Sequence, residues 1–312
     1  MLEGKTLVAF ERLEKNGKLY AVPADIRDED QTVCFPKVRT AARDVHTDSR
    51  SANAADGAVV VDSVFYTNLN SGQEYTVEGI LMDKQTQEPL LQDGKEITAK
   101  TTFTPEDGTG TVDVTFEFDA SALAGKTAVA YESVTQDGKE VAAHKDIGYE
   151  EQTIRFPEIG TKAREKESGG REVTAAQKKE MTIVDEAAYK NLIPGEEYTI
   201  KGILMDKATG KAFTDGEKEV TAEKTFIPEQ AEGTVEIEFT FEAQPLKKME
   251  IVVFEKVLSG GAEVAAHEDI HDEGQTIRVH MPGMEEHAVN PGKSVKKGDA
   301  IGILTAVVFM ML

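Results

Sequence analysis

An internal repeat is the feature of this sequence that most constrains its fold. The segment VVDSVFYTNLNSGQEYTVEGILMDKQT (60–86) matches IVDEAAYKNLIPGEEYTIKGILMDKAT (183–209) without a gap. A third, partial copy opens the chain, where LVAFERLEKNGKLYAVPADIRDEDQTVCFP matches AVAYESVTQDGKEVAAHKDIGYEEQTIRFP further along. A repeat of this kind is a structural unit that recurs along the chain. The sequence therefore contains the back part of one module, two whole modules and a tail.

The pattern within each module predicts an all-β fold. TVDVTFEF (111–118) and TVEIEFTF (234–241) alternate apolar and polar residues, which is typical of half-buried strands. Asp-Gly in VTQDGKEV and Gly-Gly in VLSGGAEV lie between strand-like runs and predict hairpins. Helical periodicity is confined to a short turn at DASALAG (119–125). We therefore expect antiparallel β-sandwiches.

The repeats and connectors predict four parts of the chain. Residues 1–37 are the remnant of a truncated module, 38–158 and 159–282 are complete sandwiches, and 283–312 form a flexible tail. Connectors such as FPEIGT are short and contain proline, which favours a stiff, end-to-end arrangement. Met1 falls inside a module, which suggests a truncated or mis-started reading frame.

Charge and cysteine content exclude several kinds of function. The formal net charge of −22 disfavours nucleic acid and anionic membrane surfaces as partners, because phosphate binding needs clustered Lys and Arg. Cys34 is the only cysteine, so neither an intrachain disulfide nor a cysteine-based metal cluster is possible. MLEGKTLVAFERLE has no apolar stretch of signal-peptide length. The apolar run from Ala300 is shorter than the about 20 residues that span a bilayer, so no membrane insertion is expected.

Four polar residues recur at equivalent places in the two whole modules and form the candidate site. They are Asp62, Glu132, His144 and Gln152 in the first module, and Asp185, Glu255, His267 and Gln275 in the second. The two glutamates interrupt apolar strand runs, TAVAYESV and EIVVFEKV. Such a glutamate either faces the interior, where it must be paired or protonated, or lies on the outer face of an edge strand. Spacing alone leaves both interpretations open.

The recurring motifs resemble a known family. VAFE, VAYE and VVFE are each followed by a hairpin and a Gln-Thr pair, and both whole modules also contain H-x-D-I and Y-T-x-x-G-I-L-M-D-K. Over roughly residues 1–282 the chain is similar to the VaFE-repeat domains of Gram-positive cell-surface adhesins, also described as Thr–Gln ester-bond domains. The resemblance implies an Ig-like (Cna-B-like) antiparallel β-sandwich. In it, an ester joins a threonine of the first strand to a glutamine of the last.

The resemblance also implies which residues react. Gln152 and Gln275 are the expected acceptors, in the last strand of each module. Thr40 in VRTAARD and Thr161 in IGTKARE occupy equivalent places in the first strand, so Thr40 would bond Gln152 and Thr161 would bond Gln275. Thr182 is the competing nucleophile in the second module. Because a valine replaces it in the first module, a shared mechanism favours Thr161.

The other recurring residues would supply acid–base chemistry. His144 and His267 would take the hydroxyl proton and then protonate the departing amine. Asp62 and Asp185 would orient the imidazole rings, and the two recurring glutamates, with pKa values raised by burial, would polarise the amide. Each module would consume its own reactants in a single turnover, so the protein would not be an enzyme. No cofactor and no metal are expected.

Two departures limit the resemblance. The partial copy has Pro23 at the histidine position, so Gln31 should stay unreacted. The end of the chain, SVKKGDAIGILTAVVFMML, is similar to the start of a cell-wall sorting signal but lacks its Leu-Pro pair and basic tail, so anchoring is expected only of an intact ancestor.

His267 and His271 are four residues apart, but their non-helical context disfavours a zinc site.

Two classes of function remain. The leading hypothesis is a structural stalk of a surface adhesin on a Gram-positive cell wall, stabilised by autocatalytic intramolecular cross-links. The alternative is a module that itself contacts a host or matrix ligand. A hydrolase is disfavoured because no Gly-x-Ser-x-Gly elbow is visible.

Overall fold

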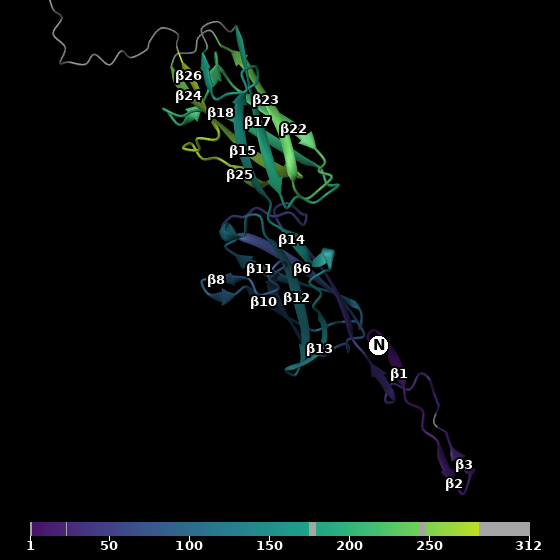
Figure 1. The fold of residues 1–312 in the computed structure, drawn as a ribbon. Helices are drawn as coiled ribbons and strands as arrows, with labels where there is room; N and C mark the ends of the chain where they lie inside the picture. Colours follow the sequence, from purple (N-terminus) through teal and green to yellow (C-terminus); the bar gives the residue numbers. More distant parts are fainter. Residues whose placement is uncertain (1, 23, 175–178, 244–247, 281–312) are drawn as a thin grey trace, which may run out of the picture.

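The regular secondary structure of the described residues is almost entirely β-strand (Figure 1). The computed structural model describes residues 2–22, 24–174, 179–243 and 248–280. Within these ranges the only helical segments are two 3₁₀ turns, η1 (Ser121–Leu123) and η2 (Glu150–Gln152). No described helix has both the length and the apolar character needed to cross a membrane. The tail expected at 283–312 lies outside the described residues.

The first sandwich consists of two sheets and a small hairpin. One sheet has the strand order β11-β6-β5, and the other has the order β10-β7-β12-β13 with β14 beside β12. Neighbouring strands in both sheets are antiparallel. The strands are β5 (Lys37–Asp44), β6 (Ala58–Thr67), β7 (Tyr75–Asp83), β8 (Leu91–Gln92), β9 (Lys95–Glu96), β10 (Thr98–Phe103), β11 (Gly110–Phe118), β12 (Thr127–Gln136), β13 (Lys139–His144) and β14 (Thr153–Arg155).

The second sandwich repeats this arrangement. Its sheets have the orders β15-β17-β23 and β16-β26-β24-β18-β19, with β22 beside β18 and β25 beside β24. One pair departs from the expected antiparallel pattern, because β16 runs parallel to β26. The strands are β15 (Glu158–Glu165), β16 (Glu172–Thr174), β17 (Glu180–Lys190), β18 (Tyr198–Asp206), β19 (Lys211–Ala212), β20 (Thr214–Asp215), β21 (Lys218–Glu219), β22 (Thr221–Phe226), β23 (Gly233–Glu242), β24 (Met249–Ser259), β25 (Ala262–His267) and β26 (Thr276–His280).

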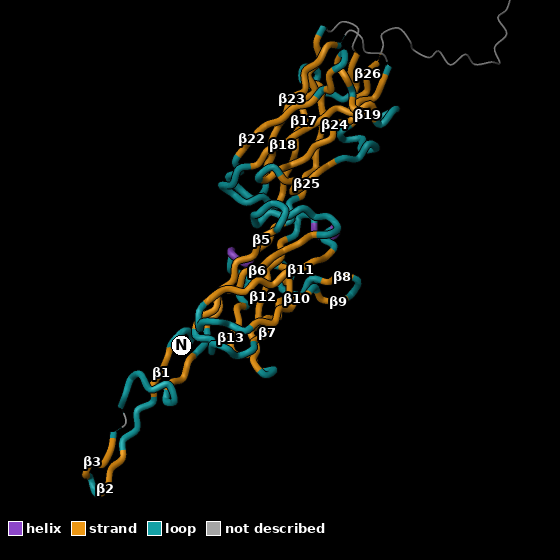
Figure 2. Tube along the Cα trace, turned by 180° about the vertical axis from the view of Figure 1, so that it is seen from behind, coloured by secondary structure: helices purple, strands orange, loops and turns teal. Residues whose placement is uncertain are grey.

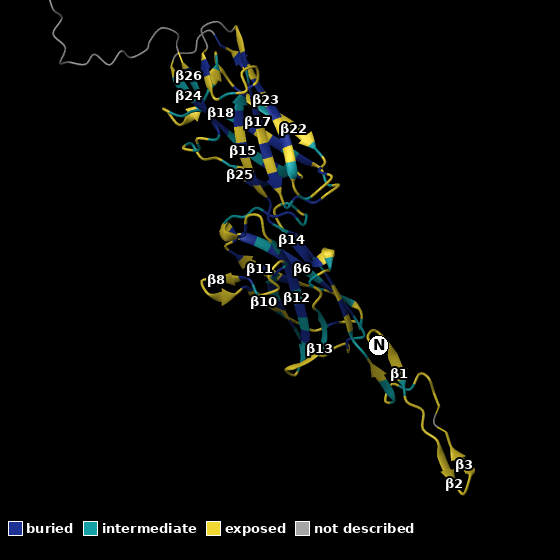
Figure 3. Ribbon diagram, viewed as in Figure 1, coloured by how far each residue is buried: buried dark blue, intermediate teal, exposed yellow. Residues whose placement is uncertain are grey.

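Alternation along the strands places an apolar core inside each sandwich. On β11, Val114, Phe116 and Phe118 are buried and the residues between them are exposed, as the sequence pattern predicts. The buried apolar side chains form two separate clusters, one in each sandwich. Figure 3 shows the alternation of buried and exposed positions along the strands. The expected all-β fold of antiparallel sandwiches is confirmed.

Both predicted hairpins are present. Asp137 (φ 50°) and Gly138 (φ 75°) connect β12 to β13, and Gly260 (φ 58°) and Gly261 (φ 89°) connect β24 to β25. A positive φ at both central residues gives the tight turn whose twist matches that of the two strands. These turns return the chain alongside the strand that carries the recurring glutamate, and each returning strand ends at the recurring histidine.

The described residues before the first sandwich form only two-stranded ribbons. Their apolar side chains are exposed, including Phe10 at 52%, Tyr20 at 65% and Ile26 at 67%. A two-stranded ribbon has no second layer against which to bury a face. This described part of the partial copy therefore has no core of its own. The paired strands are β1 (Thr6–Val8) with β4 (Thr32–Cys34), and β2 (Leu13–Lys15) with β3 (Lys18–Ala21).

Asn191 connects the two sandwiches. It follows β17 with φ 64°, a left-handed conformation that asparagine tolerates better than most residues. Its Nδ2 donates hydrogen bonds to the carbonyl oxygens of Lys126 (2.5 Å) and Phe156 (3.4 Å) in the first sandwich. Its Oδ1 accepts a hydrogen bond from Thr127 Oγ1 at 2.9 Å. One side chain of the second sandwich thus holds three groups of the first.

Further polar contacts cross the same joint. Ser51 Oγ and Tyr198 Oη are 2.9 Å apart and buried. Asn53 Nδ2 donates to Glu263 Oε1 at 3.2 Å. Figure 2 shows the two sandwiches following one another in an elongated arrangement. These contacts favour a stiff joint.

We expect the substitution Asn191→Gly to loosen this joint. Glycine keeps the positive φ without strain but removes three hydrogen bonds, each contributing about 1 kcal/mol. Small-angle X-ray scattering of the full chain should then give a smaller radius of gyration and a broader distance distribution. Asp137→Gly, at a positive-φ position in the β12–β13 turn, is the matched control and should leave the scattering unchanged. Identical scattering from both variants would contradict a stiffening role for Asn191.

Candidate functional site

The recurring polar residues come together inside each sandwich, at the edge where its two sheets meet. β5 is an edge strand of its sheet and contacts β13 and η2, which belong to the opposite side. β15 has equivalent contacts with β25 and β26 in the second sandwich. The first site contains Thr40 on β5, Asp62 on β6, Glu132 on β12, His144 at the end of β13 and Gln152 at the end of η2.

Strand register explains why these side chains converge. Glu132 and His144 are directly opposite one another on β12 and β13, so both project from the same face of the sheet. Asp62 is opposite Ala42, two residues after Thr40, so Asp62 and Thr40 also share a face. Because those faces are the inner ones, the four side chains meet between the sheets.

A glycine makes room at the centre of each site. Gly79 is opposite Glu132 on the neighbouring strand β7, and a Cβ built on it would lie 2.6 Å from Phe116 Cζ. Gly202 is opposite Glu255, and its Cβ would lie even closer to the ring of the equivalent phenylalanine of the second sandwich. The glycine of the repeated Y-T-x-x-G motif is therefore required for packing of the aromatic ring beside the buried glutamate.

In the first site the threonine, the glutamine and the glutamate are linked by hydrogen bonds. Gln152 Nε2 donates to Glu132 Oε2 at 2.9 Å and to the carbonyl oxygen of His144 at 3.4 Å. Thr40 Oγ1 donates to Glu132 Oε2 at 3.3 Å and lies 3.4 Å from His144 Nδ1. The side chains of Thr40, Glu132 and Gln152 are completely buried. A potential nucleophile and an acceptor amide thus lie together in the interior, with the half-buried base His144 beside them.

The second site has the same composition and a closer approach of the two reacting groups. Gln275 Nε2 donates to Glu255 Oε2 at 2.8 Å and also contacts Thr161 Oγ1 directly. His267 Nδ1 accepts a hydrogen bond from the backbone N–H of Thr161 at 3.3 Å. Asp185 lies against Glu255 and completes the set.

Each site contains a pair of carboxyl groups that cannot both be ionised. Burial raises the pKa of Glu132 well above its usual range, and the neighbouring carboxyl of Asp62 raises it further. Burial also raises the pKa of Asp62, to about 6. The pKa values of Glu255 and Asp185 are raised for the same main reason. Two desolvated carboxylates in contact repel strongly, so the pair retains a proton.

The shared proton also satisfies otherwise unpaired oxygens. Glu132 Oε1 and both carboxyl oxygens of Asp62 are buried and accept no well-formed hydrogen bond from another described group, although the Thr40 hydroxyl and the Ala41 N–H lie near Asp62. Glu255 Oε1 and Asp185 are in the same situation. A proton on Oε1 of the glutamate that is donated to the aspartate supplies the missing hydrogen bond. The glutamate in each site is therefore a neutral acid in contact with the amide nitrogen of the glutamine.

His144 has an environment that favours its neutral form. Burial lowers the pKa of its imidazole, and the nearby cations Lys37 and Arg39 act in the same direction, against Asp146 and Glu3. A neutral imidazole has one ring nitrogen that can accept a proton. His144 Nδ1 is the nitrogen that lies beside the hydroxyl of the threonine.

The structure decides one alternative that the sequence leaves open, the position of the glutamates, and bears on two others. The recurring glutamates face the interior, since Glu132 and Glu255 are 0% exposed. Thr182, the competing nucleophile, bonds Thr240 Oγ1 at 2.9 Å on an exposed part of the sheet, whereas Thr161 contacts the glutamine. His271 is exposed, and no cluster of metal-binding side chains occurs among the described residues.

Two expectations about the site are wrong in detail. The acceptor glutamines are not inside the last strands, because Gln152 ends η2 and Gln275 precedes β26 by one residue. This irregular backbone lets the glutamine side chain turn inward before the strand pairing begins. The expected orientation of His267 by Asp185 is also not observed. Asp185 bonds Glu255, and the carboxylate paired with the imidazole belongs to Asp272.

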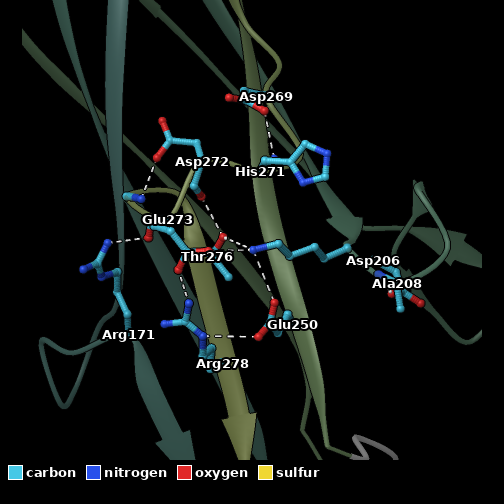
Figure 4. Close-up of polar contacts among 12 residues, drawn as sticks. Arg171, Asp206, Ala208, Glu250, Asp269, His271, Asp272, Glu273, Thr276 and Arg278 are labelled. Carbon is cyan, nitrogen blue, oxygen red and sulfur yellow. Dashed lines mark hydrogen bonds and ion pairs between the residues drawn. The ribbon is translucent and has the colours of Figure 1, made fainter.

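A clamp of charged residues surrounds the glutamine loop and was not predicted from the sequence. Figure 4 shows it in the second sandwich. Lys207 Nζ contacts Glu273 Oε1 at 3.0 Å, Glu250 Oε2 at 3.3 Å and Thr276 Oγ1 at 3.4 Å. Arg278 also pairs with Glu273. These contacts hold both sides of Gln275.

The first sandwich has the same clamp. Lys84 Nζ contacts Glu150 Oε1 at 2.6 Å and Thr153 Oγ1 at 3.4 Å, and Arg155 pairs with Glu150 at 3.2 Å. Arg50 donates to the carbonyl oxygen of Glu150 at 2.6 Å. The repeat of L-M-D-K in the sequence was the available signal, but that motif predicts only a strand end. Its lysine is the residue that holds the loop.

The partial copy at the start of the chain does not assemble this site in the described residues. Its glutamate, Glu11, is exposed, and the residue at the histidine position is Pro23. Gln31 is only half-buried. The expectation that Gln31 stays unreacted remains a prediction.

Comparison with known proteins gives a family match over almost the whole chain. A family model described as "T-Q ester bond containing domain" matches residues 1–35, 36–156 and 157–279. A search of curated proteins found no match.

Similar solved structures include a bacterial adhesin from Mobiluncus mulieris described as containing intramolecular disulfide, isopeptide and ester bond cross-links. In one crystal form the identity is 14%, with 73% of this chain and 82% of that chain covered at a TM-score of 0.32. In a second crystal form the identity is 15%, with 74% of this chain and 83% of that chain covered at a TM-score of 0.33. A putative beta-galactosidase from Bacteroides fragilis has 8% identity, with 72% of this chain and 34% of that chain covered at a TM-score of 0.28. Similarity at this level carries no argument about function.

The raised pKa of Asp62 predicts a pH-dependent stability in a chain that lacks both threonine hydroxyls. In Thr40→Val/Thr161→Val, the folded state binds more protons than the unfolded state between the ordinary Asp value of 3.8 and the folded value of about 6. The contribution of this group to the free energy of unfolding is therefore fully present below about pH 4. It is lost as the pH rises through about 6, which lowers the free energy of unfolding by about 3 kcal/mol. Urea unfolding from about pH 4 to about pH 8 measures it. Adding Asp62→Asn should flatten the dependence, and equal slopes with and without this change would contradict the shared proton.

Proposed function

The chain belongs to the family of T-Q ester bond containing domains, and from this premise we propose that each of its two sandwiches forms an internal Thr–Gln ester. The bonds are Thr40–Gln152 and Thr161–Gln275. The observation that carries the proposal is the direct contact of Thr161 Oγ1 with the amide of Gln275 beside a buried, protonated glutamate. The same set of residues around Thr40 supports it independently.

The reaction joins an alcohol and a primary amide and releases ammonia. The threonine Oγ1 attacks the side-chain carbonyl carbon of the glutamine, and its proton passes to the histidine Nδ1. The C–N bond then breaks while the imidazolium gives the same proton to the departing nitrogen, which leaves as ammonia. The neutral glutamate, whose Oε2 lies 2.9 Å (Glu132) or 2.8 Å (Glu255) from that nitrogen, orients the amide and keeps its own proton on Oε1. One ester and one ammonia form from one hydroxyl and one amide, with no net change in protons.

Exclusion of water supports an ester product over a hydrolysed one. The threonine side chain is 0% exposed at Thr40 and 5% exposed at Thr161, and both glutamines are completely buried. In a site this dry the hydroxyl has no competitor for the carbonyl carbon, and the electrostatic effect of each polar group is strong. Because both reactants belong to the same chain, each module reacts once. We therefore propose that the protein is not an enzyme.

We propose that the cross-linked sandwiches form the stalk of a bacterial surface adhesin, on the cell wall of a Gram-positive organism. Each ester would join the first strand of a sandwich to the residue just before its last strand, which are the points where the chain enters and leaves. Tension along the stalk would then pass through a covalent bond and not through the sheets. Closing a loop of this size removes denatured-state entropy worth about 4–5 kcal/mol, by analogy with a disulfide.

The elongated arrangement and the joint at Asn191 favour the stalk role. Binding of a host or matrix ligand by these modules remains a prediction. Glycan or matrix-protein arrays probed with the full chain would detect it as saturable binding.

Intact-mass measurement of the purified full chain tests the ester proposal. The mass should fall below the value calculated from the sequence by two ammonia molecules, one for each bond. Thr161→Ala should restore one of them, because the nucleophile is lost. His267→Ala should do the same, because the base is lost while most of the packing remains.

Thr182→Ala is the matched control, since it removes a threonine hydroxyl from the same sandwich without touching the site. It should keep both mass losses. A full calculated mass for the unmodified chain, or an unchanged loss in Thr161→Ala, would overturn the assignment.

A further inference from the structure

The two sites differ at one position beside the histidine. Asp272 and Tyr149 occupy equivalent places, each three residues before the reacting glutamine. The rest of the set is shared: threonine, aspartate, glutamate, histidine, glutamine and the charged clamp. The chain therefore contains two versions of the site, one with and one without a carboxylate at this position.

In the second sandwich Asp272 fixes the imidazole of His267 from the side opposite the threonine. Asp272 Oδ2 lies 3.0 Å from His267 Nε2, and both side chains are mostly buried. His267 Nδ1 accepts the backbone N–H of Thr161 at 3.3 Å. A nitrogen that accepts must carry a lone pair, so the proton of the neutral ring is on Nε2 and is donated to Asp272. Nδ1 is thereby left as the basic nitrogen on the side of the threonine.

The loop holds the Asp272 carboxylate in place. Its Oδ1 accepts the backbone N–H of Gly274 at 2.5 Å, and its carbonyl oxygen accepts Thr276 Oγ1 at 2.6 Å. Thr276 is itself held by Lys207, whose Nζ lies 3.4 Å from Thr276 Oγ1. The charged clamp around Gln275 therefore positions the partner of the base as well as the acceptor amide.

In the first sandwich a tyrosine replaces this carboxylate. The ring of Tyr149 packs edge-on against His144, with centroids 4.7 Å apart and planes at 70°. Its hydroxyl donates to Glu151 Oε2 at 2.9 Å. Within the described residues no carboxylate forms an ion pair with the His144 ring.

We propose that Asp272 is a positioning residue for ester formation, and that it makes the Thr161–Gln275 bond form faster than the Thr40–Gln152 bond. The inference rests on the proposed function. When Thr161 Oγ1 gives its proton to His267 Nδ1, the ring becomes positive, and Asp272 stays ionised and stabilises that charge until the proton moves on. His144 in the first sandwich has only the edge of an aromatic ring beside it.

Other charged groups lie near the imidazole rings of His267 and His144. His267 faces Asp185 and Glu255 as well as Asp272, but the first two share a proton in the carboxyl pair. His144 is influenced by Asp146 and Glu3 and, in the opposite sense, by Lys37 and Arg39. The main unmatched contribution is therefore the direct contact of Asp272.

The test follows bond formation as the full chain folds. A pulse of labelled chain is made by cell-free synthesis and sampled over time, and the two cross-linked peptides are quantified by mass spectrometry after proteolysis. In the wild-type chain the Thr161–Gln275 peptide should appear first. Asp272→Asn, which keeps the Oδ1 acceptor for Gly274, should slow that bond by about 10- to 100-fold and leave Thr40–Gln152 unchanged. Asp272→Glu should partly restore the rate.

The dependence of the rate on pH separates positioning from simple loop support. Asp272→Asn removes the carboxylate that contacts the imidazolium formed during the reaction, so the acid limb of the rate profile for Thr161–Gln275 should move to lower pH. A loss of loop structure alone would reduce the rate without moving the midpoint. The converse variant, Tyr149→Asp, should accelerate Thr40–Gln152 and move its acid limb to higher pH.

Each outcome has a distinct meaning. If Asp272→Asn forms its bond at the wild-type rate, or with an unmoved midpoint, the role of Asp272 is refuted while the ester itself stands. If Asp272→Asn fails to fold, the rate in Tyr149→Asp decides, and an unchanged Thr40–Gln152 rate there counts against the proposal. If the wild-type chain forms neither peptide, the proposed function fails.

Discussion

The buried pair of carboxyl groups is the constraint on which the rest of each sandwich depends. Placing Glu132 and Asp62 in contact, both 0% exposed, costs stability, because desolvation opposes charge on either group. The surrounding structure holds them there nonetheless. Gly79 leaves space for an aromatic ring, the hairpin turn brings His144 opposite Glu132, and the clamp fixes the glutamine loop. Buried carboxyl groups with raised pKa values are typical of functional sites.

The same geometry links the site to the mechanical design of the chain. Thr40 lies on the first strand of its sandwich, and Gln152 lies immediately before the last. Phe156, just after that strand, accepts a hydrogen bond from Asn191 at the joint. Asn68 makes the equivalent contact one module earlier, donating to the carbonyl oxygen of Phe35 at 3.3 Å. Site and joint are therefore adjacent along the chain in both copies, and force entering through a joint reaches the proposed ester within a few residues.

Local patterns predicted the fold well, because alternation and turn chemistry depend on neighbours in the sequence. The strands and both hairpins follow from repeated residues, whereas the proximity of Thr161 to Gln275 was an expectation that came from the family resemblance. The interior position of the glutamates did not follow, since it depends on which strands flank β12 and β24. The partner of His267 was misassigned for a similar reason. Asp185 recurs in both modules and Asp272 in only one, yet contact depends on the path of a loop.

Comparison with the partial copy shows that the motif alone does not bury its glutamate. Glu11 stands in the same VAFE motif as Glu132 and is followed by a hairpin and a glutamine at the same spacing. It is nevertheless exposed, because the described residues around it form two-stranded ribbons with no opposing sheet. A raised pKa requires a second sheet that carries the aspartate and the threonine. The proposed reaction therefore depends on the closed sandwich, in which folding brings the first strand against the last.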